Sequence, residues 1–404
     1  MKKDRIKVSF WSKTFYFILA VVCRIVTFLI LGFTLKTDKT VREWKRSKKA
    51  FIILSTHPSE VDAVALLVSG FPRYTRFVVG AQQLYKGLQG KILRAITSIP
   101  KRQFTPDLRA IREIMDTIRE GHILAMTPEG RVSMDGTENP VDDSTAKLIK
   151  KMEVPVAILR THGTYFVKPP YYNHGLNIGK ISAELSPLLT EDKVKELTES
   201  EIASCINSAI RYDASEELRG KDRKYRSKNG SPLKNVSHLF YRCPSCGKMY
   251  TVKDDGNKLW CESCGLEKKL SNGVFIEGDK EDGIPDTISG WNKLQLAFEH
   301  EYWAKDDASF SSKTKKTMMT LGKDMDFSPA AGEGRIVLSK DGLHYEDSEE
   351  SLDISLENLP GVSADYEYGF LTIYQGDIIR RIYLEDERMV TRFVNSLMVL
   401  KGLK

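Results

Sequence analysis

Cysteine is scarce in this sequence, and its distribution limits the chemistry that the chain can use. Only six of the 404 residues are cysteine. Four of them form two Cys-x2-Cys pairs, whereas Cys23 and Cys205 are isolated in apolar surroundings, where a thiol behaves as a small core residue. Neither isolated cysteine lies near the motifs described below, so we assign no cysteine the role of a nucleophile.

The sequence also lacks the small-residue cleavage site of a secretory signal peptide. Residues 15–33 are apolar except for Arg24 and Thr27, and this apolar run is longer than that of a signal peptide. Its length approaches the roughly 20 residues that a membrane-spanning helix needs. We therefore expect the segment to be retained. Basic residues flank it on both sides, at Lys2, Lys3, Arg5, Lys7 and Lys13 and at Lys36, Lys39, Arg42, Lys45, Arg46, Lys48 and Lys49.

Positive charge on both flanks favours keeping both ends of this segment on the cytoplasmic side of a membrane. A helix that lies in the interface, or dips in and returns, satisfies this better than a spanning helix. The alternative is an amphipathic helix packed on the protein's own core, but the apolar residues cover every face of the expected helix. We predict attachment to the cytoplasmic face of the cell membrane.

The chain is basic and too long for one ordinary core. Its net charge is +7 and its pI is about 8.8, which fits a partner with negative charge, either an anionic membrane surface or nucleic acid. A chain of 404 residues is expected to form two or more domains.

The most informative stretch is Ser55-Thr56-His57-Pro58-Ser59-Glu60-Val61-Asp62. It follows a short buried-strand pattern, and Pro58 suits the first position of a helix. His57 would then lie outside the helix, where Asp62 can accept a hydrogen bond from one ring nitrogen. The other nitrogen could take a proton from a hydroxyl. Such a pair is a general base without its own nucleophile, although the spacing alone is weak evidence, because His344 and Glu349 repeat it.

A second motif follows the next predicted buried strand, residues 123–126. Here Thr127-Pro128-Glu129-Gly130-Arg131 places a glutamate, a glycine and an arginine at the end of a strand. Arginine can bind two phosphate oxygens, glycine lets a ligand approach the backbone, and glutamate can accept a hydrogen bond from a glycerol hydroxyl. The motif therefore suits a polyol phosphate.

Four blocks in this order resemble those of the glycerolipid acyltransferase family, which contains the lysophosphatidate acyltransferases. His57 and Asp62 match its His-x4-Asp block, Glu129 and Gly130 match its Pro-Glu-Gly block, and residues 99–102 and 154–156 match the other two. The resemblance covers residues 48–213. The sequence departs from the family pattern at Thr56, where asparagine is common, at the arginine that follows Gly130 directly, and in the register of the basic residues at 101–102.

The resemblance implies an O-acyltransferase that moves a fatty acyl group from an acyl thioester to the free hydroxyl of a lysophospholipid. The expected acceptor is 1-acylglycerol-3-phosphate, in phospholipid biosynthesis, and the expected donor is acyl-CoA or acyl-carrier protein. His57 would deprotonate the hydroxyl while Asp62 orients the ring. The substrate-binding residues would be Lys101, Arg102, Glu129, Gly130 and Arg131. The alternative is an inactive, membrane-bound scaffold that binds protein or nucleic acid through its C-terminal parts.

The two Cys-x2-Cys pairs, Cys243 with Cys246 and Cys261 with Cys264, predict a structural metal site. Each pair is followed by glycine, and four thiolates can close a tetrahedral Zn²⁺ shell. The pattern resembles a rubredoxin-like zinc ribbon, and thiolate ligands indicate a reducing compartment. A module of some thirty residues has too little core to fold unaided, so Zn²⁺ would hold it together. It lacks interleaved basic and aromatic residues, so we do not expect nucleic acid as a partner.

The fold class expected for the whole chain is α/β. Strands and helices alternate from residue 50 to 165, with strand candidates at 76–79 and 95–99 and a helix start at Thr105-Pro106-Asp107. Residues 191–212 should form one closing helix. Residues 307–331 look polar and irregular. A series of strands capped by one final helix then resembles a pleckstrin-homology-like module. The predicted parts are a membrane-associated segment (1–36), an acyltransferase domain (37–216), a basic linker (217–235), a zinc ribbon (236–272) and a helix followed by a β-rich domain (285–404).

Overall fold

The structure is a computed structural model of the whole chain, and two compact units can be described in it. It describes residues 8–103, 107–172, 175–228, 230–277, 283–321, 327–359, 361–375 and 378–404. The first unit contains Met1–Ser133, Thr137–Val167 and Ile178–Glu217. The second contains Met134–Gly136, Lys168–Asn177 and Leu218–Lys404, so the Cys-x2-Cys pairs and the β-rich end of the chain belong to one unit.

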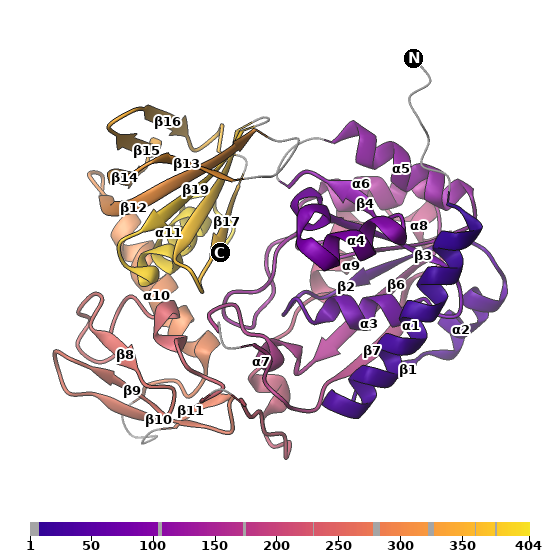
Figure 1. Cartoon of the computed structure of the whole chain (residues 1–404), viewed down its shortest axis with the longest axis horizontal. Coiled ribbons are helices and arrows are strands. Elements are labelled where there is room, and N and C mark those ends of the chain that lie inside the picture. The colour runs from indigo at the N-terminus through magenta and orange to yellow at the C-terminus, as the bar shows by residue number, and fades with distance from the viewer. Residues whose placement is uncertain are drawn as a thin grey trace. The chain divides into compact units, whose positions relative to one another are not determined.

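The first unit is built on a seven-stranded sheet with the order β1-β7-β6-β2-β5-β3-β4 (Figure 1). Strands β6, β2, β5, β3 and β4 run parallel, while β7 is antiparallel to β6 and parallel to β1. Every residue of β2 is buried, as expected for a parallel strand that is covered on both faces. The strands are β1 (Thr34–Thr37), β2 (Phe51–Ser55), β3 (Thr75–Gly80), β4 (Ile99–Lys101), β5 (Ile123–Met126), β6 (Val156–His162) and β7 (Ser182–Leu189).

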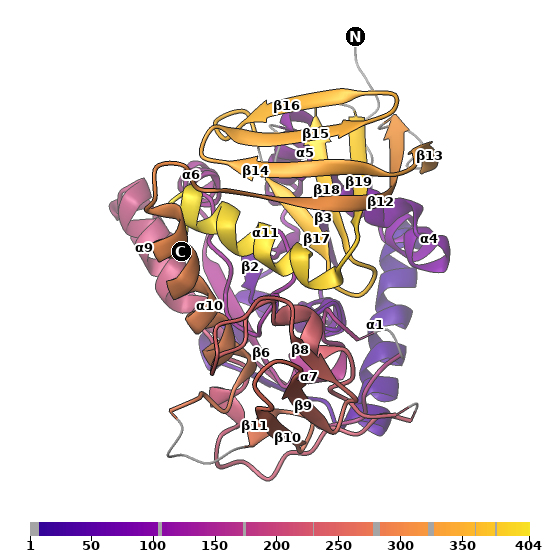
Figure 2. The same ribbon diagram turned by 90° about the vertical axis from the view of Figure 1, so that its left-hand side faces the viewer.

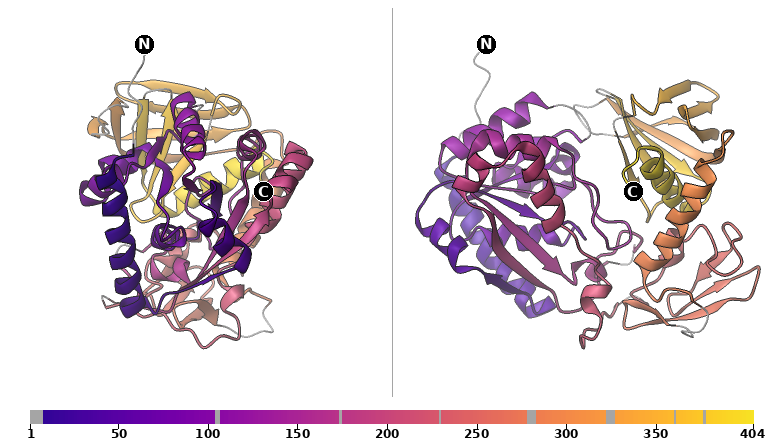
Figure 3. Two further views of the ribbon diagram at one scale, coloured as in Figure 1. Left: turned by 90° about the vertical axis from the view of Figure 1, so that its right-hand side faces the viewer. Right: turned by 180° about the vertical axis from the view of Figure 1, so that it is seen from behind.

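Helices cover both faces of this sheet. On one face lie α5, α6 and α9 (Figure 3, right). Apolar residues of these helices pack on Ile52, Leu54 and Leu124 of the central strands. On the other face, α3 contacts β6 and is itself covered by α1. The helices are α1 (Phe10–Leu31), α2 (Lys39–Arg46), α3 (Asp62–Ser69), α4 (Gly87–Ala95), α5 (Leu108–Arg119), α6 (Ser144–Met152), α7 (Thr164–Val167), α8 (Glu191–Glu196) and α9 (Glu199–Ala209). Short 3-10 turns lie at η1 (Ala81–Tyr85) and η2 (Glu216–Leu218).

Helix α1 packs on the domain with one narrow face and leaves most of its apolar side chains exposed. Tyr16 and Ala20 are buried, and the Tyr16 hydroxyl donates to the carbonyl of Leu67 in α3 at 3.0 Å. Trp11 and Leu29, by contrast, are 77% and 73% exposed. The helix is long and apolar enough to cross a membrane, although these properties alone are weak evidence that it does.

Three local predictions are wrong. The single closing helix expected over residues 191–212 is interrupted, because Thr198 and Glu201 form a capping box that starts α9 anew. The strand expected over residues 95–99 is replaced by the end of α4 and the later strand β4. Residues 307–331 contain two strands, β12 (Ser309–Leu321) and β13 (Ser328–Ala331). The helix start expected at Thr105 and Pro106 lies outside the described residues, and the cap of α5 is Asp107.

The second unit contains a small sheet, two long helices and a larger antiparallel sheet (Figure 2). The small sheet has the order β11-β10-β9-β8 and carries the cysteine pairs, with the turn η3 (Val236–Leu239) before it. Its strands are β8 (Val252–Asp254), β9 (Lys258–Cys261), β10 (Glu267–Ser271) and β11 (Phe275–Glu277). The long helices are α10 (Ile288–Trp303) and α11 (Glu387–Leu400).

The larger sheet follows the path β16-β15-β14-β12-β19-β18-β17, with β13 beside β12. The long strand β12 pairs with both β14 and β19 and so joins two antiparallel meanders. The chain ends in α11, which packs on β17, β18 and β19. This β-rich fold closed by a terminal helix agrees with the sequence prediction. The remaining strands are β14 (Gly334–Ser339), β15 (Gly342–Asp347), β16 (Ser351–Ser355), β17 (Val362–Asp365), β18 (Phe370–Gln375) and β19 (Ile378–Leu384).

Candidate functional site

The structure brings His57 and Asp62 together at the carboxyl end of β2. His57 lies two residues beyond the strand, and its Nδ1 is 3.5 Å from Oδ2 of Asp62. The His57 side chain is 20% exposed while that of Asp62 is 1% exposed, so a ligand can reach the ring but not the carboxylate. A separation of 3.5 Å is long for a hydrogen bond, and such contacts are often long in catalytic sites without substrate. The ring faces Asp62 with Nδ1, which leaves Nε2 for a reacting group.

Helix α3 begins at Asp62, not at Pro58 as the sequence predicted. Asp62 therefore lies in the first helical turn, where a negative charge interacts favourably with the helix dipole. Its Oδ2 accepts a hydrogen bond from the backbone N–H of Ser59 at 2.7 Å, and its Oδ1 accepts one from the hydroxyl of Thr161 at 2.8 Å. These bonds fold residues 58–61 into a turn that brings Asp62 back toward His57.

Glu129 holds the backbone of the turn formed by residues 57–61, which we call the histidine turn. It follows β5, the strand next to β2, and its side chain is buried. The backbone N–H of His57 donates to Oε1 at 2.8 Å, while the backbone and side-chain nitrogens of Asn139 donate to Oε2 at 2.8 and 3.2 Å. In addition, the N–H of Ser133 donates to the carbonyl of His57 at 3.0 Å. Glu129 thus joins the two sequence motifs at the end of the sheet.

The other expected substrate-binding residues occupy the same edge of the sheet. Gly130 is exposed and has a φ of +68°, a conformation that favours glycine. Its carbonyl accepts a hydrogen bond from the side chain of Gln103 at 2.8 Å. Arg131 follows as a partly buried residue, and Lys101 and the exposed Arg102 lie at the end of β4. In the strand order, β3 separates β4 from β5, but the bond from Gln103 to Gly130 shows that the loop after β4 reaches the glutamate motif.

The electrostatic environment of the site acts on both of its central side chains. Burial lowers the pKa of His57, but the nearby carboxylate of Asp62 together with the charges of Glu129 and Glu60 outweighs this effect. The pKa of His57 is therefore raised above its ordinary value of 6.5. Burial raises the pKa of Glu129 to about 7, against the lowering effect of the N–H groups of Asn139 and His57.

Sequence reasoning missed several residues of this site. Thr161, Asn139 and Gln103 contact the predicted residues, but no local pattern marks Asn139 or Gln103. Thr161 is a polar residue at the end of a buried strand, and that position could have drawn attention to it. Thr56, the departure from the family pattern, is fully buried, and its Oγ1 accepts a hydrogen bond from the N–H of Thr161 at 3.2 Å. It therefore connects two strands and does not face a ligand.

A second histidine and carboxylate meet on β6. Nδ1 of His162 lies 2.8 Å from Oε2 of Glu217. Neighbouring residues of a strand point to opposite faces, so His162 and Thr161 face different sides of the sheet. The hydrogen bond of this pair involves neither His57 nor Asp62, so a substitution of His162 can serve as a control for one of His57.

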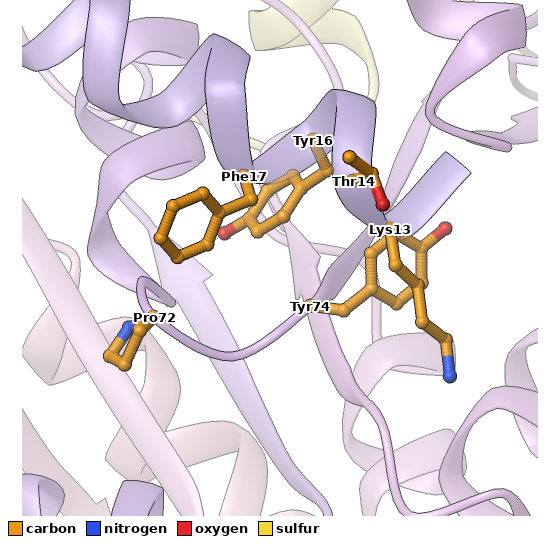
Figure 4. A pocket seen from close by; sticks show the side chains of 6 residues that line it. All are labelled: Lys13, Thr14, Tyr16, Phe17, Pro72 and Tyr74. Carbon is orange, nitrogen blue, oxygen red and sulfur yellow. The ribbon is translucent and has the colours of Figure 1, made fainter. Parts of the chain in front are cut away.

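A shallow hollow beside α1 is separate from the candidate catalytic pair. Its volume is about 410 Å³, and its lining residues are Lys13, Thr14, Tyr16, Phe17, Pro72 and Tyr74 (Figure 4). Tyr74 directly precedes β3, so the hollow lies near the amino ends of the parallel strands. His57 follows the carboxyl end of β2, at the opposite edge of the sheet. The hollow therefore adds nothing to the chemistry of the site.

The four cysteines of the second unit form a cluster that could hold a metal ion. All four Sγ atoms lie within 4.8 Å of one another, and the Cys243–Cys264 and Cys246–Cys261 pairs are each 3.8 Å apart. Metal–sulfur bonds of about 2.3 Å in a tetrahedron give sulfur separations of about 3.8 Å, so the cluster fits such an ion. Gly247 and Gly265 both have a φ of +72°, and each donates its N–H to the first cysteine carbonyl of its pair at 3.0 Å.

We call residues 240–277, which include the four cysteines and strands β8 to β11, the cysteine sheet. Buried polar contacts join it to α10 and α11. Oε1 of Gln295 on α10 accepts hydrogen bonds from the N–H groups of Tyr241 and Arg242 at 2.8 and 3.2 Å. On α11, Arg388 donates to the carbonyl of Val252 at 2.9 Å, and Arg392 donates to the hydroxyl of Tyr250 at 3.2 Å. The cluster is therefore part of the packing of the whole second unit.

The α/β sheet and the histidine–aspartate pair at its edge define an acyltransferase-type domain. Residues 35–159 match the family model described as Acyltransferase. Among solved structures, the chain is similar to the crystal structure of the 1-acyl-sn-glycerophosphate (LPA) acyltransferase PlsC from Thermotoga maritima. That similarity has 19% sequence identity, covers 52% of this chain and 95% of that chain, and has a TM-score of 0.38. No curated protein gives a significant match.

We expect metal removal to loosen the second unit beyond the cysteine sheet, because α10 and α11 pack on that sheet. A strong chelator, or a Cys246→Ser/Cys264→Ser variant, should increase amide hydrogen exchange in both helices by at least about tenfold. Exchange in β2 and β5 of the first unit should stay unchanged. The control is Cys205→Ser, which removes a cysteine of the first unit. Unchanged exchange in α10 and α11 after metal loss would contradict this dependence.

Proposed function

We propose that the chain is an O-acyltransferase that transfers a fatty acyl group from a thioester donor to the free hydroxyl of a lysophospholipid. One observation carries the proposal: Nδ1 of His57 faces the buried carboxylate of Asp62, while the imidazole ring is partly exposed to solvent. A neutral imidazole held in this way can accept a proton from an alcohol through Nε2. The alcohol then attacks the thioester carbonyl, the carbon–sulfur bond breaks, and the thiol leaves with a proton.

Asp62 would fix the tautomer of His57 and stabilise the imidazolium that forms during proton transfer. Glu129 would position the histidine by its backbone, because its two carboxylate oxygens accept hydrogen bonds from the backbone of His57 and from Asn139. This role differs from the glycerol contact expected from the sequence. Lys101, Arg102 and Arg131 are proposed to attract the acceptor's phosphate, and the exposed backbone at Gly130 to contact its glycerol. The proposed acceptor is 1-acylglycerol-3-phosphate, with acyl-CoA or acyl-carrier protein as donor.

We further propose that α1 attaches the enzyme to the cytoplasmic face of the cell membrane, where acceptor and product reside. One face of α1 is bound to α3, so the helix is proposed to lie in the membrane interface with its exposed side toward the lipid. For the cysteine cluster we propose Zn²⁺. It has no redox chemistry, it accepts four thiolates in a closed tetrahedral shell, and its role there would be structural.

Replacing the proposed base should abolish acyl transfer. We expect His57→Ala to lower thiol release from acyl-CoA in the presence of lysophosphatidate by about 10²- to 10⁴-fold, the usual contribution of a general base. The matched control is His162→Ala, which breaks the other histidine–carboxylate pair and should retain most activity. Labelled acyl donor identifies the diacyl product. Full activity of His57→Ala, or absence of labelled product with the wild type, would support the scaffold alternative.

The pH dependence should report the pKa of His57. The imidazole must be neutral to accept a proton, so kcat/KM should fall as the pH drops through a pKa that lies above 6.5. In Asp62→Asn, the loss of the negative charge should lower the activity and move this acidic limb to lower pH. The control is Asp192→Asn, an exposed carboxylate on α8, which should leave the limb in place. An acidic limb that does not move in Asp62→Asn would refute the proposed pairing.

Membrane attachment should depend on the exposed side of α1. Ile25 and Leu29 are 54% and 73% exposed, and we expect Ile25→Asp/Leu29→Asp to reduce flotation with anionic phospholipid vesicles by at least about tenfold. The control places the same charges at Tyr368 and Leu403, which are 61% and 47% exposed in the second unit. If the α1 variant floats as well as the wild type, the helix is not the membrane anchor.

A further inference from the structure

Thr161 binds the proposed catalytic carboxylate from outside the histidine turn. It lies near the carboxyl end of β6, which runs parallel to β2, and its hydroxyl donates to Oδ1 of Asp62 at 2.8 Å. Thr161 and Asp62 are 3% and 1% exposed. A carboxylate that is removed from water needs hydrogen-bond donors in place of solvent. Thr161 supplies one such donor, and the N–H of Ser59 supplies another at 2.7 Å.

The two donors constrain Asp62 differently. Ser59 belongs to the same turn as Asp62, so its N–H moves with that turn and cannot fix the turn to the sheet. Thr161 belongs to a strand at the centre of the sheet. Its N–H donates to Oγ1 of Thr56 at 3.2 Å, and its hydroxyl lies 3.4 Å from that of Thr164 on α7. Thr161 therefore fixes the carboxylate of Asp62 to the rigid core.

We infer that Thr161 is a positioning residue of the acyl-transfer site: its hydroxyl fixes the Asp62 carboxylate in the orientation that faces His57. The inference rests on the proposed function. It adds Thr161, which lies beyond the last of the four family blocks, residues 154–156. Without the hydroxyl, Oδ1 of Asp62 faces an apolar group, and the carboxylate turns to another donor. Because the His57–Asp62 separation is already 3.5 Å, a small rotation breaks the contact.

Thr161→Val tests this role, because valine keeps the shape of threonine and removes the hydroxyl. We expect kcat to fall by about 10- to 100-fold, by analogy with the loss seen when a hydrogen-bond partner that orients a metal ligand is removed. The KM for lysophosphatidate should change less than about twofold, since the hydroxyl is turned to Asp62. Thr161→Ser keeps the hydroxyl and should restore most of the activity.

A control substitution separates positioning from a general loss of stability. Thr117 is also fully buried, and its hydroxyl also binds a charged side chain, Arg76, at 3.0 Å. It lies on α5, and its hydroxyl bonds to Arg76 and to the carbonyl of Glu113, both outside the histidine turn. Thr117→Val should therefore lower the melting temperature about as much as Thr161→Val but leave kcat within about twofold of the wild type.

A double-mutant cycle gives the decisive measurement. If Thr161 acts through Asp62, Thr161→Val should cost less than about twofold in an Asp62→Asn background, although it costs at least about tenfold in the wild type. An equal cost in both backgrounds, or full activity of Thr161→Val, would overturn the inference while leaving the proposed function intact. A wild-type chain that releases no thiol would instead overturn the proposed function, and the inference with it.

Discussion

The burial of the Asp62 carboxylate is the constraint on which the candidate site depends. A negative charge inside a protein must be met by hydrogen-bond donors or an opposite charge. Asp62 meets this need with the Ser59 N–H and the Thr161 hydroxyl, and its remaining influence falls on His57. The same demand applies to Glu129, whose oxygens collect the N–H groups of His57 and Asn139. Two buried carboxylates thus shape one loop from opposite sides.

The sheet makes this arrangement possible, because parallel strands deliver their following loops to one edge. β2 lies between β6 and β5. Thr161 lies on β6, and His57 and Glu129 lie in the loops that follow β2 and β5. Residues separated by about a hundred positions in the chain therefore come within hydrogen-bond distance. The imidazole of His57 is supported by strands on both sides, and its orientation does not rely on a flexible loop alone.

The sequence could predict the parts of this site that depend on local chemistry. Apolar strands, the histidine–aspartate spacing and the two Cys-x2-Cys pairs are visible in short windows. The structure contains the buried strands β2 and β5, brings His57 close to Asp62 and clusters the four cysteines. It could not predict the partners of Glu129, because they depend on which strands become neighbours. The strand β12 was missed for a related reason: its inward positions include Ser312, Thr314 and Thr317, which give no apolar alternation.

The second unit shows that a cysteine cluster and a β-rich fold can share one set of buried contacts. Arg392 of α11 lies 3.3 Å from Glu299 of α10 and contacts Tyr250 of the cysteine sheet, and its guanidinium lies 4.0 Å from the ring of Phe310. A buried ion pair contributes little net stability, but removing one partner leaves an unpaired charge and is costly. Displacing the cysteine sheet would expose this pair to partial solvation and leave Tyr250 unbound. The ordering of the cysteine loops therefore acts on the packing of both helices, and through α11 on the strands β17, β18 and β19.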